Sequence, residues 1–319
     1  MKLAPYTIQV AQELTIVVGA PLVSGFTAKV EAILQGRRGP RILQPYYDLA
    51  KFFRKEMLMP DEASPLFILA PLLAFVCYLV VPLLIPVLTS FPLPLGYMGD
   101  ILGGGIVLST AGFLVALAGT ETSSPYAQLG SSRAMTFGAL IEPTVLFVVF
   151  VVGLITSTDL PYAMSQAVHS SLGEVLAPAH ILAAIAFFMV VLADTGRIPI
   201  ETHSGTLEFG MIEEARVLEH SGPAYAFLAW GSSIKQLILY TILVDVFVAP
   251  WGLSSSRELG SVLLAVPALL SKAMGLGVVF ALVDNSFSKL RLFKIPEFIV
   301  AAFVLAVLAV VIFYLGGAS

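Results

Sequence analysis

Four charged residues lie inside long apolar stretches of this sequence. They are Glu13, Glu142, Asp245 and Lys272. A charge at the centre of a membrane-spanning helix costs on the order of 2.5–3.5 kcal/mol, so each is expected to face a polar interior rather than lipid. Pro143 follows Glu142 directly, and a proline inside a helix frees a backbone carbonyl nearby. We predict that these residues serve a proton or ion path, with purely structural pairing as the alternative.

A second group of carboxylates occupies the segment 194–222, which reads DTGRIPIETHSGTLEFGMIEEARVLEHSG. Its acidic residues are Asp194, Glu201, Glu208, Glu213, Glu214 and Glu219. The simplest interpretation is a solvated acidic loop. Apolar residues such as Phe209 and Ile212 are interleaved among the acids, however, so part of the segment must pack. Because a carboxylate held against apolar surface has a raised pKa, it can exchange protons near neutral pH. This segment is therefore a second candidate for a proton path.

Residues 35–55, QGRRGPRILQPYYDLAKFFRK, concentrate positive charge next to a helical pattern. Apolar side chains follow helical spacing at Ile42, Leu43, Tyr46, Leu49, Ala50, Phe53 and Met57. Charged residues, among them Lys51 and Arg54, fall on the other face. This pattern predicts an amphipathic helix on the membrane surface or in a groove of a partner. The segment therefore has two interpretations, an orientation signal and a docking surface, and we expect it to be both.

The composition is that of an integral membrane protein. The mean hydropathy is +0.93 and 12% of the 319 residues are charged, against about 25% in soluble domains. We predict an all-α fold with about eight spans in one polytopic domain, residues 1–319. The expected spans are 7–29, 66–88, 101–119, 134–156, 177–195, 233–251, 261–283 and 297–316. Lys235 and Asp284 fall near span ends, and we expect them to extend to the membrane surface.

Lysine and arginine are distributed unequally between the two sides of these spans. Thirteen lie in or beside the loops of about 30–65, 120–133, 194–232 and 284–296, and two, Lys2 and Arg257, lie on the other side. Because cytoplasmic loops carry the excess of these residues, the four loops are expected to face the cytoplasm and both termini to lie outside. We expect a multi-pass protein of the inner (cytoplasmic) membrane, with the lipid bilayer as a partner.

Few residues of the chain are suited to metal binding. The single cysteine, Cys77, lies in an apolar run, so the sequence offers no cysteine cluster for an iron–sulfur centre. Its four histidines show no metal-ligand spacing with one another. We therefore expect no metal or cofactor bound directly, and any redox centre is expected on a partner.

Several segments in combination resemble the respiratory complex I subunit 1 family. GRRGP (36–40) followed by LQPYYDLAKFFRKE (43–56) is similar to its first cytoplasmic loop. Only Arg41 and Ile42 separate the two parts, which resembles the membrane-bound [NiFe] hydrogenase branch of the family. Other segments that resemble this branch are TETSSPYAQLGSSR (120–133), TGRIP (195–199), LEFGMIEEARVLEHSG (207–222), WGSSIKQ (230–236) and DNSFSKLRLF (284–293). The sequence departs from the pattern of this branch at three places. His220 stands where Tyr is usual, Glu213 stands where His is common, and residues 200–203 read IETH where the branch often has VDNP.

The resemblance implies a non-catalytic subunit of an oxidoreductase complex of the formate hydrogenlyase or hydrogenase-4 type. Such a subunit anchors the hydrophilic large and small hydrogenase subunits and an iron–sulfur protein, which carry the [NiFe] centre and iron–sulfur clusters. It joins them to antiporter-like membrane subunits that move protons or sodium. Carried onto this sequence, the acidic path would consist of Glu142, Glu201, Glu208, Glu213, Glu214 and Glu219. Residues that would dock the module or orient the carboxylates are Arg37, Arg38, Arg133 and Arg197, with Lys51 and Arg54 on the amphipathic helix.

Two other functions remain as alternatives. One is a quinone-binding subunit of an NADH:quinone oxidoreductase, with its cavity near residues 36–60 and 194–222. The other is a free-standing ion transporter. The short link after GRRGP counts against the first alternative, and the absence of a visible internal repeat counts against the second.

Overall fold

The computed structural model describes residues 3–60, 63–122, 124–170, 177–196, 213–249, 251–286 and 294–316. Within these ranges the regular structure is helical, and the β-pairing consists of an isolated parallel bridge between Thr89 and Ser254. The predicted all-α fold is confirmed.

The long helices of the described chain match the expected spans. Seven are long and apolar enough to cross a membrane. They are α1 (Pro5–Leu34), α3 (Pro65–Leu84), α4 (Ile101–Thr120), α5 (Pro125–Thr156), α10 (Gly222–Ile242, continued by the π-helical turns η2, Leu243–Val248), α11 (Leu259–Ser286) and α12 (Ile295–Gly316). An eighth apolar helix, α8 (Pro178–Asp194), has 17 residues and would extend about 26 Å at 1.5 Å per residue. The shorter elements are α2 (Gln44–Phe53), η1 (Pro94–Tyr97), α6 (Pro161–Ser170) and α9 (Glu213–Arg216).

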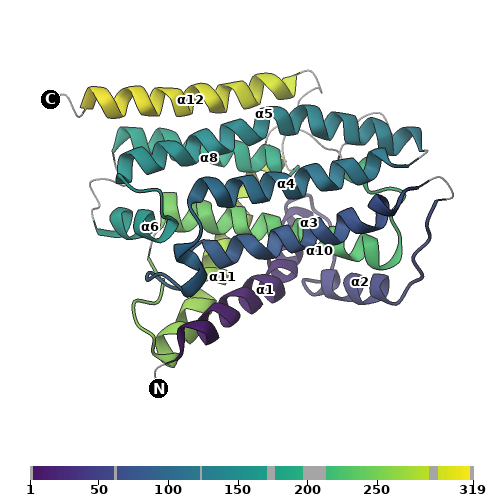
Figure 1. Ribbon diagram of the computed structural model, residues 1–319, viewed down its shortest axis with the longest axis horizontal. Coiled ribbons are helices and arrows are strands. Elements are labelled where there is room, and N and C mark those ends of the chain that lie inside the picture. The colour runs from purple at the N-terminus through teal and green to yellow at the C-terminus, as the bar shows by residue number, and fades with distance from the viewer. Residues whose placement is uncertain are drawn as a thin grey trace.

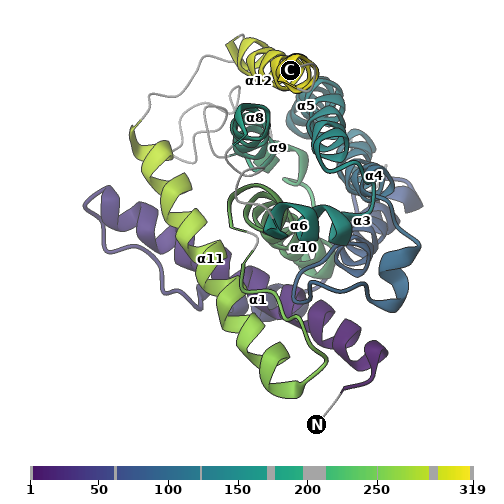
Figure 2. The same ribbon diagram turned by 90° about the vertical axis from the view of Figure 1, so that its left-hand side faces the viewer.

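The long helices run side by side, and the two termini lie at the same end of the bundle (Figure 1). Helix α2 lies at the opposite end, and α6 lies at the end of the termini. Viewed along the bundle, α10 occupies the middle, with α1 and α11 on one side and α3, α4 and α5 on the other (Figure 2). An even number of crossings would place both termini on one side of a membrane, and that α8 is the eighth crossing stays a prediction.

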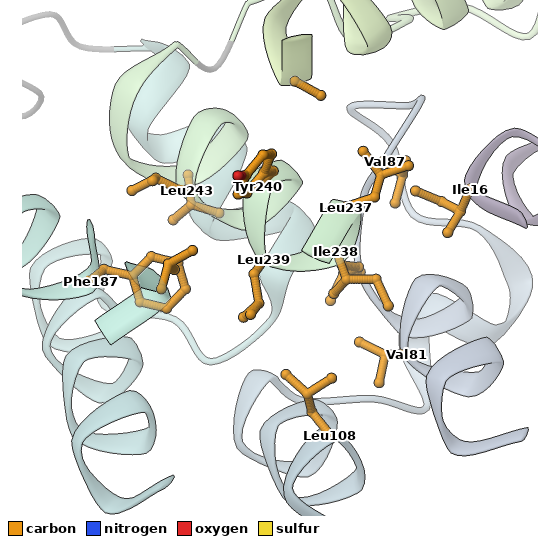
Figure 3. Packing of buried hydrophobic residues seen from close by; sticks show 14 of the residues in the cluster. Ile16, Val81, Val87, Leu108, Phe187, Leu237, Ile238, Leu239, Tyr240 and Leu243 are labelled. Carbon is orange, nitrogen blue, oxygen red and sulfur yellow. The ribbon is translucent and has the colours of Figure 1, made fainter. Parts of the chain in front are cut away.

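The core surrounds α10. Four consecutive residues, Leu237 to Tyr240, are each at most 1% exposed, which is possible only where neighbours cover the helix on every side. Their side chains point in different directions, toward Ile16 of α1, Leu108 of α4 and Phe187 of α8 (Figure 3). Because α10 has no lipid-facing side here, it is the element best placed to hold polar groups away from lipid.

Two helices begin earlier than the sequence indicated. Helix α5 begins at Pro125, so most of the expected loop 120–133 is helical, and α10 begins at Gly222, so 222–232 is helical rather than loop. In each case a proline occupies the first turn, where its missing N–H costs nothing. The hydropathy rises only later, because the first turns of these helices pack against protein rather than lipid. The loops expected at 120–133 and 194–232 are therefore shorter than predicted.

The predicted amphipathic helix is present as α2. Its aromatic residues pack on the first turns of α10, with Phe52 against Tyr225 (ring centroids 4.6 Å apart) and Phe53 against Phe227 (5.3 Å). It also contacts α1 at Gly25, where a side chain would collide with the carbonyl of Ile42. The apolar face of α2 is therefore used inside the chain.

Candidate functional site

Two neighbouring cavities lie at the end of the bundle where α1, α8 and α11 end and α10 begins. The small cavity has a volume of about 70 Å³ and is lined by Glu142 of α5 together with small residues of α4 and α5. The large cavity has a volume of about 410 Å³ and lies between α1, α8, α9, α10 and α11. Four residues line both cavities: Asp194, Gly196, Arg216 and Lys235.

Carboxylates outnumber cations in the large cavity. Its ionisable acids come from four elements, with Glu31 on α1, Asp194 on α8, Glu214 on α9 and Asp284 on α11. The basic residues of the lining are Arg216 and Lys235, and the uncharged polar ones include Ser24, Tyr78, Tyr225, Ser232 and Gln236. Apolar side chains, among them Val115, Val217 and Leu228, complete the lining, so the cavity combines charged groups with an apolar surface. Glu31 and Asp284 were missed as site residues because each lies at a helix end, where its position in the sequence indicates surface exposure.

Lys235 does not extend to the membrane surface as expected, but lies inside the site. Its Nζ donates to Asp194 Oδ1 at 2.6 Å, and the two side chains are 14% and 18% exposed, respectively. The same ammonium donates to the backbone carbonyl of Asp194 at 3.3 Å, at the last residue of α8. Because α8 ends at this point, the lysine meets both a carboxylate and the negative end of a helix. Asp284 likewise lines the large cavity, contrary to the expected surface position.

Small residues allow α9 to approach the cavities closely. At Gly130 of α5, a side chain would meet the backbone nitrogen of Arg216 at 3.0 Å, and at Gly119 of α4 one would meet the carbonyl of Arg216 at 2.8 Å. The backbone of Arg216 therefore passes between two glycines. This contact places Arg216 at the boundary of both cavities and Glu214 in the large one.

Asp245 and Lys272 form an ion pair of their own and line neither cavity. Asp245 lies in η2 and is 1% exposed, and its Oδ2 has no hydrogen-bond partner among the described residues. Lys272 also donates to the carbonyls of Ala249 (3.2 Å) and Trp251 (2.8 Å). The structure thus separates this pair from Glu142, although the sequence grouped all three as one path.

The remaining acidic candidates divide into those the structure describes and those it does not. Glu201, Glu208 and Arg197 lie outside the described residues. Glu213 begins α9, but its side chain also lies outside the described part. Glu219 is half-buried and lines neither cavity. Of the six acids assigned to the path through the resemblance, the structure therefore brings Glu142 and Glu214 to the cavities.

The basic candidates lie mainly on the surface around α2. Arg37, Arg38, Lys51 and Arg54 are exposed. Arg133 lies within α5, half-buried, and lines neither cavity. We call the exposed face formed by residues 37–41 and the outer side of α2 the α2 surface. It is connected to the large cavity through Phe52, which packs on Tyr225 of the cavity lining.

Two titratable groups near this end of the bundle have perturbed pKa values. Burial raises the pKa of Tyr46, whose hydroxyl donates to the Val18 carbonyl. Burial lowers the pKa of His220 to about 4, so the imidazole is neutral at physiological pH. His220 is 6% exposed and stacks on Phe67 of α3 at 4.1 Å between ring centroids. No group of three or more possible metal ligands occurs among the described residues.

Comparisons with known proteins agree on one family. The family model described as NADH dehydrogenase matches residues 8–315. The chain is 32% identical to formate hydrogenlyase subunit 4 of Escherichia coli (strain K12), over 94% of this chain and 96% of that protein. It is 28% identical to hydrogenase-4 component C of the same organism, over 96% and 95%. A subunit of the NADH-quinone oxidoreductase of Granulibacter bethesdensis is 29% identical, over 71% and 66%.

A solved structure has the same fold. It is a chain of the membrane-bound sulfane sulfur reductase, an archaeal respiratory membrane complex, with a TM-score of 0.80 and 18% sequence identity. The alignment covers 97% of this chain and 99% of that one. The helical arrangement described above is therefore shared along nearly the whole length of both chains.

Proposed function

The chain belongs to the NADH dehydrogenase family, and we propose that it is the membrane-anchor and coupling subunit of a hydrogenase-type respiratory complex. In this role it docks a hydrophilic module that carries [NiFe] and iron–sulfur centres, and it links electron transfer there to the movement of protons or sodium ions. Formate hydrogenlyase subunit 4 and hydrogenase-4 component C match this chain over nearly their whole lengths, which supports the choice of a hydrogenase-type complex.

The observation that carries the coupling role is the pair of charged cavities. Glu142 lies within a span, and Glu31, Asp194, Glu214 and Asp284 continue the ionisable groups toward the α2 end of the bundle. Ionisable residues inside a membrane are costly, and they are found where ions or protons move. The two cavities share residues, so a proton that enters the large cavity has a route of polar groups to Glu142.

The α2 surface is the proposed docking site for the hydrophilic large and small subunits and the iron–sulfur protein. Its arginines and lysines are exposed and its Tyr47 is 59% exposed, while Phe52 packs on Tyr225 and Phe53 on Phe227 of α10. Helix α2 is thus held rigidly and presents charge outward. In this arrangement the α2 end faces the cytoplasm, both termini lie outside the inner membrane, and antiporter-like subunits contact the lipid-facing helices.

Purification and one substitution test this function. Mild-detergent extraction is expected to yield the chain together with nickel- and iron–sulfur-containing subunits, and a stable lone monomer would contradict the anchor role. Glu142→Gln removes a titratable group from the small cavity without changing its volume. We expect the assembled complex to turn over but to build a smaller proton or sodium gradient in reconstituted vesicles.

A matched control distinguishes the loss of a carboxylate in the small cavity from the loss of a carboxylate elsewhere in the chain. Glu297→Gln makes the same chemical change at an exposed residue, which pairs with Lys294 at 3.0 Å and lies in neither cavity. This variant is expected to behave as the unmodified complex. A normal gradient in Glu142→Gln would remove Glu142 from the path.

The quinone-binding alternative has less support. Tyrosine and aliphatic side chains line part of the large cavity, as a quinone ring requires, but four carboxylates line it as well. The NADH-quinone oxidoreductase relative also matches this chain over a smaller share of both lengths than the hydrogenase relatives do. Quinone found in the purified complex, or turnover that depends on added quinone, would favour this alternative. Transport by the purified chain alone would favour the free-standing transporter.

A further inference from the structure

We propose that Lys235 is a gate between the two cavities, and that it works by exchanging its ion-pair partner between Asp194 and Glu142. This inference rests on the proposed function, because it assigns a device to the same proton path. It concerns a residue whose position in the sequence indicated only a surface lysine.

The location of the pair makes it a boundary. Asp194 and Lys235 line both cavities, whereas Glu142 lines the small cavity only and Glu214 lines the large cavity only. A proton that travels from the large cavity to Glu142 must therefore pass the ion pair. Arg216 also lines both cavities, and its backbone lies between Gly119 and Gly130, whereas Lys235 extends a flexible four-carbon stem from α10.

In the observed state the gate is closed on the Asp194 side. The ammonium of Lys235 donates to the carboxylate at 2.6 Å and to the last carbonyl of α8 at 3.3 Å. Positive charge held at this point repels an arriving proton or cation.

The charges around the pair provide a second position for the lysine. Among the described residues, the ionisable groups besides Lys235 that face the two cavities are Glu31, Tyr78, Glu142, Asp194, Glu214, Arg216, Tyr225 and Asp284. Among the described residues, Glu142 is the carboxylate other than Asp194 in the small cavity, and it lines this cavity together with both members of the pair. Lysine has a flexible four-carbon stem and a compact ammonium, so it can change partner without movement of the helix.

Partner exchange follows from proton arrival. When a proton neutralises Asp194, the ammonium loses its Coulombic attraction to that carboxylate and is drawn to ionised Glu142. Its departure lets the proton continue, and its return requires that Asp194 be ionised again. While a proton passes, the single ammonium of Lys235 cannot pair with Asp194 and Glu142 at once. The path between the large cavity and Glu142 is therefore never open along its whole length. This prevents protons from leaking when no electrons are transferred.

A static ion pair that only closes the end of α8 is the competing interpretation, and the two differ in what a neutral residue should do. Lys235→Met keeps an unbranched side chain, one atom shorter, and removes its charge, whereas Lys235→Arg keeps the charge. Each variant is assembled into the whole complex and reconstituted in lipid vesicles. Turnover is driven with reduced methyl viologen, and internal pH and radioactive sodium uptake are followed together with electron flow.

If the gate exists, Lys235→Met transfers electrons on the partner subunits but moves fewer ions per electron, and Lys235→Arg restores the ratio in large part. An unchanged ratio of ions to electrons in Lys235→Met would overturn the gate. Should Lys235→Met fail to assemble, Asp194→Asn provides the second measurement. It leaves the lysine in place without an anionic partner on α8, and it is expected to lower the same ratio. If neither Lys235→Met nor Asp194→Asn assembles into the complex, then the ion pair has a structural role and the gate is refuted.

The result separates the gate from the proposed function. If Glu142→Gln lowers the ratio of ions to electrons and Lys235→Met does not, then the path through the cavities is supported and the gate is refuted. If neither substitution alters the ratio of ions to electrons, then both the gate and the proposed coupling role are refuted.

Discussion

Acidification is expected to release the turn around His220 from the start of α3. The imidazole is 6% exposed and stacks on Phe67 at 4.1 Å, and its backbone N–H donates to the Val217 carbonyl at 3.0 Å. The next residue, Ser221, accepts a hydrogen bond at its side chain from the Leu58 N–H at 2.8 Å. This turn connects α9 to α10, so it fixes the approach of Arg216 to the cavities.

The sign and size of the effect follow from the pKa of His220. Burial lowers this pKa from 6.5 to about 4, so the docked turn binds the neutral imidazole and excludes the charged one. Docking is therefore unaffected above about pH 6.5 and is progressively weakened as the pH falls toward about 4. At 1.36 kcal/mol per pH unit, the difference of about 2.5 pH units amounts to about 3 kcal/mol, or about 300-fold in the equilibrium between docked and released turn.

Hydrogen–deuterium exchange of peptides that cover 213–222 measures this equilibrium, after correction for the intrinsic pH dependence of exchange. His220→Phe is the matched control, because it keeps a flat ring against Phe67 and cannot be protonated. The unmodified protein should lose protection between about pH 6 and pH 4.5, while His220→Phe should keep it. Equal loss of protection in both proteins, or an imidazole that titrates near 6.5, would refute the reasoning.

Two further substitutions test how the site is positioned. Gly130→Val places a side chain within about 3.0 Å of the Arg216 backbone, which should displace α9. We expect a lower ratio of ions to electrons and a loss of about 1–3 kcal/mol of stability. A variant with unchanged thermal stability and coupling would show that α9 can shift freely. Asp245→Asn leaves the ammonium of Lys272 without its anion at a site where Asp245 is 1% exposed. We expect the free energy of unfolding to fall by about 3 kcal/mol, which is at the low end for a broken buried ion pair. The loss is at the low end because Lys272 is 19% exposed and keeps two carbonyl partners. The double variant Asp245→Asn with Lys272→Met should recover most of the thermal unfolding temperature in detergent, and no recovery would mean that the carboxylate stabilises the bundle by another contact.

Much of the architecture could be predicted from local patterns. Apolar runs of about 20 residues define the long helices, because a bilayer requires that length. The amphipathic spacing at 42–57 predicts α2, since its apolar face repeats at the helical period. The one-sided distribution of lysine and arginine predicts that both termini lie outside the membrane, and this stays a prediction. In the bundle the two termini lie at the same end, opposite α2. Helix starts at Pro125 and Gly222 were placed too late, because hydropathy does not register helical turns that pack on protein.

The composition of the candidate site could be predicted only in part. Glu142 is conspicuous in the sequence because a carboxylate inside an apolar run has no simpler explanation. Lys235 and Asp284 are not conspicuous, because lysine or aspartate near the end of a span commonly reaches the membrane surface. Glu31 carries no signal at all in a segment rich in charge.

The sequence by itself determined that this chain is a helical membrane protein with its chemistry gathered on one side. Those properties depend on hydrophobicity and charge, which each segment carries whatever its neighbours are. Only the tertiary structure decided which charges meet. It brought Asp194 to Lys235 across α8 and α10, seated Arg216 between Gly119 and Gly130, and set Asp245 and Lys272 apart as a separate pair. Such contacts join residues that are far apart in the chain, and they depend on how the helices pack around α10.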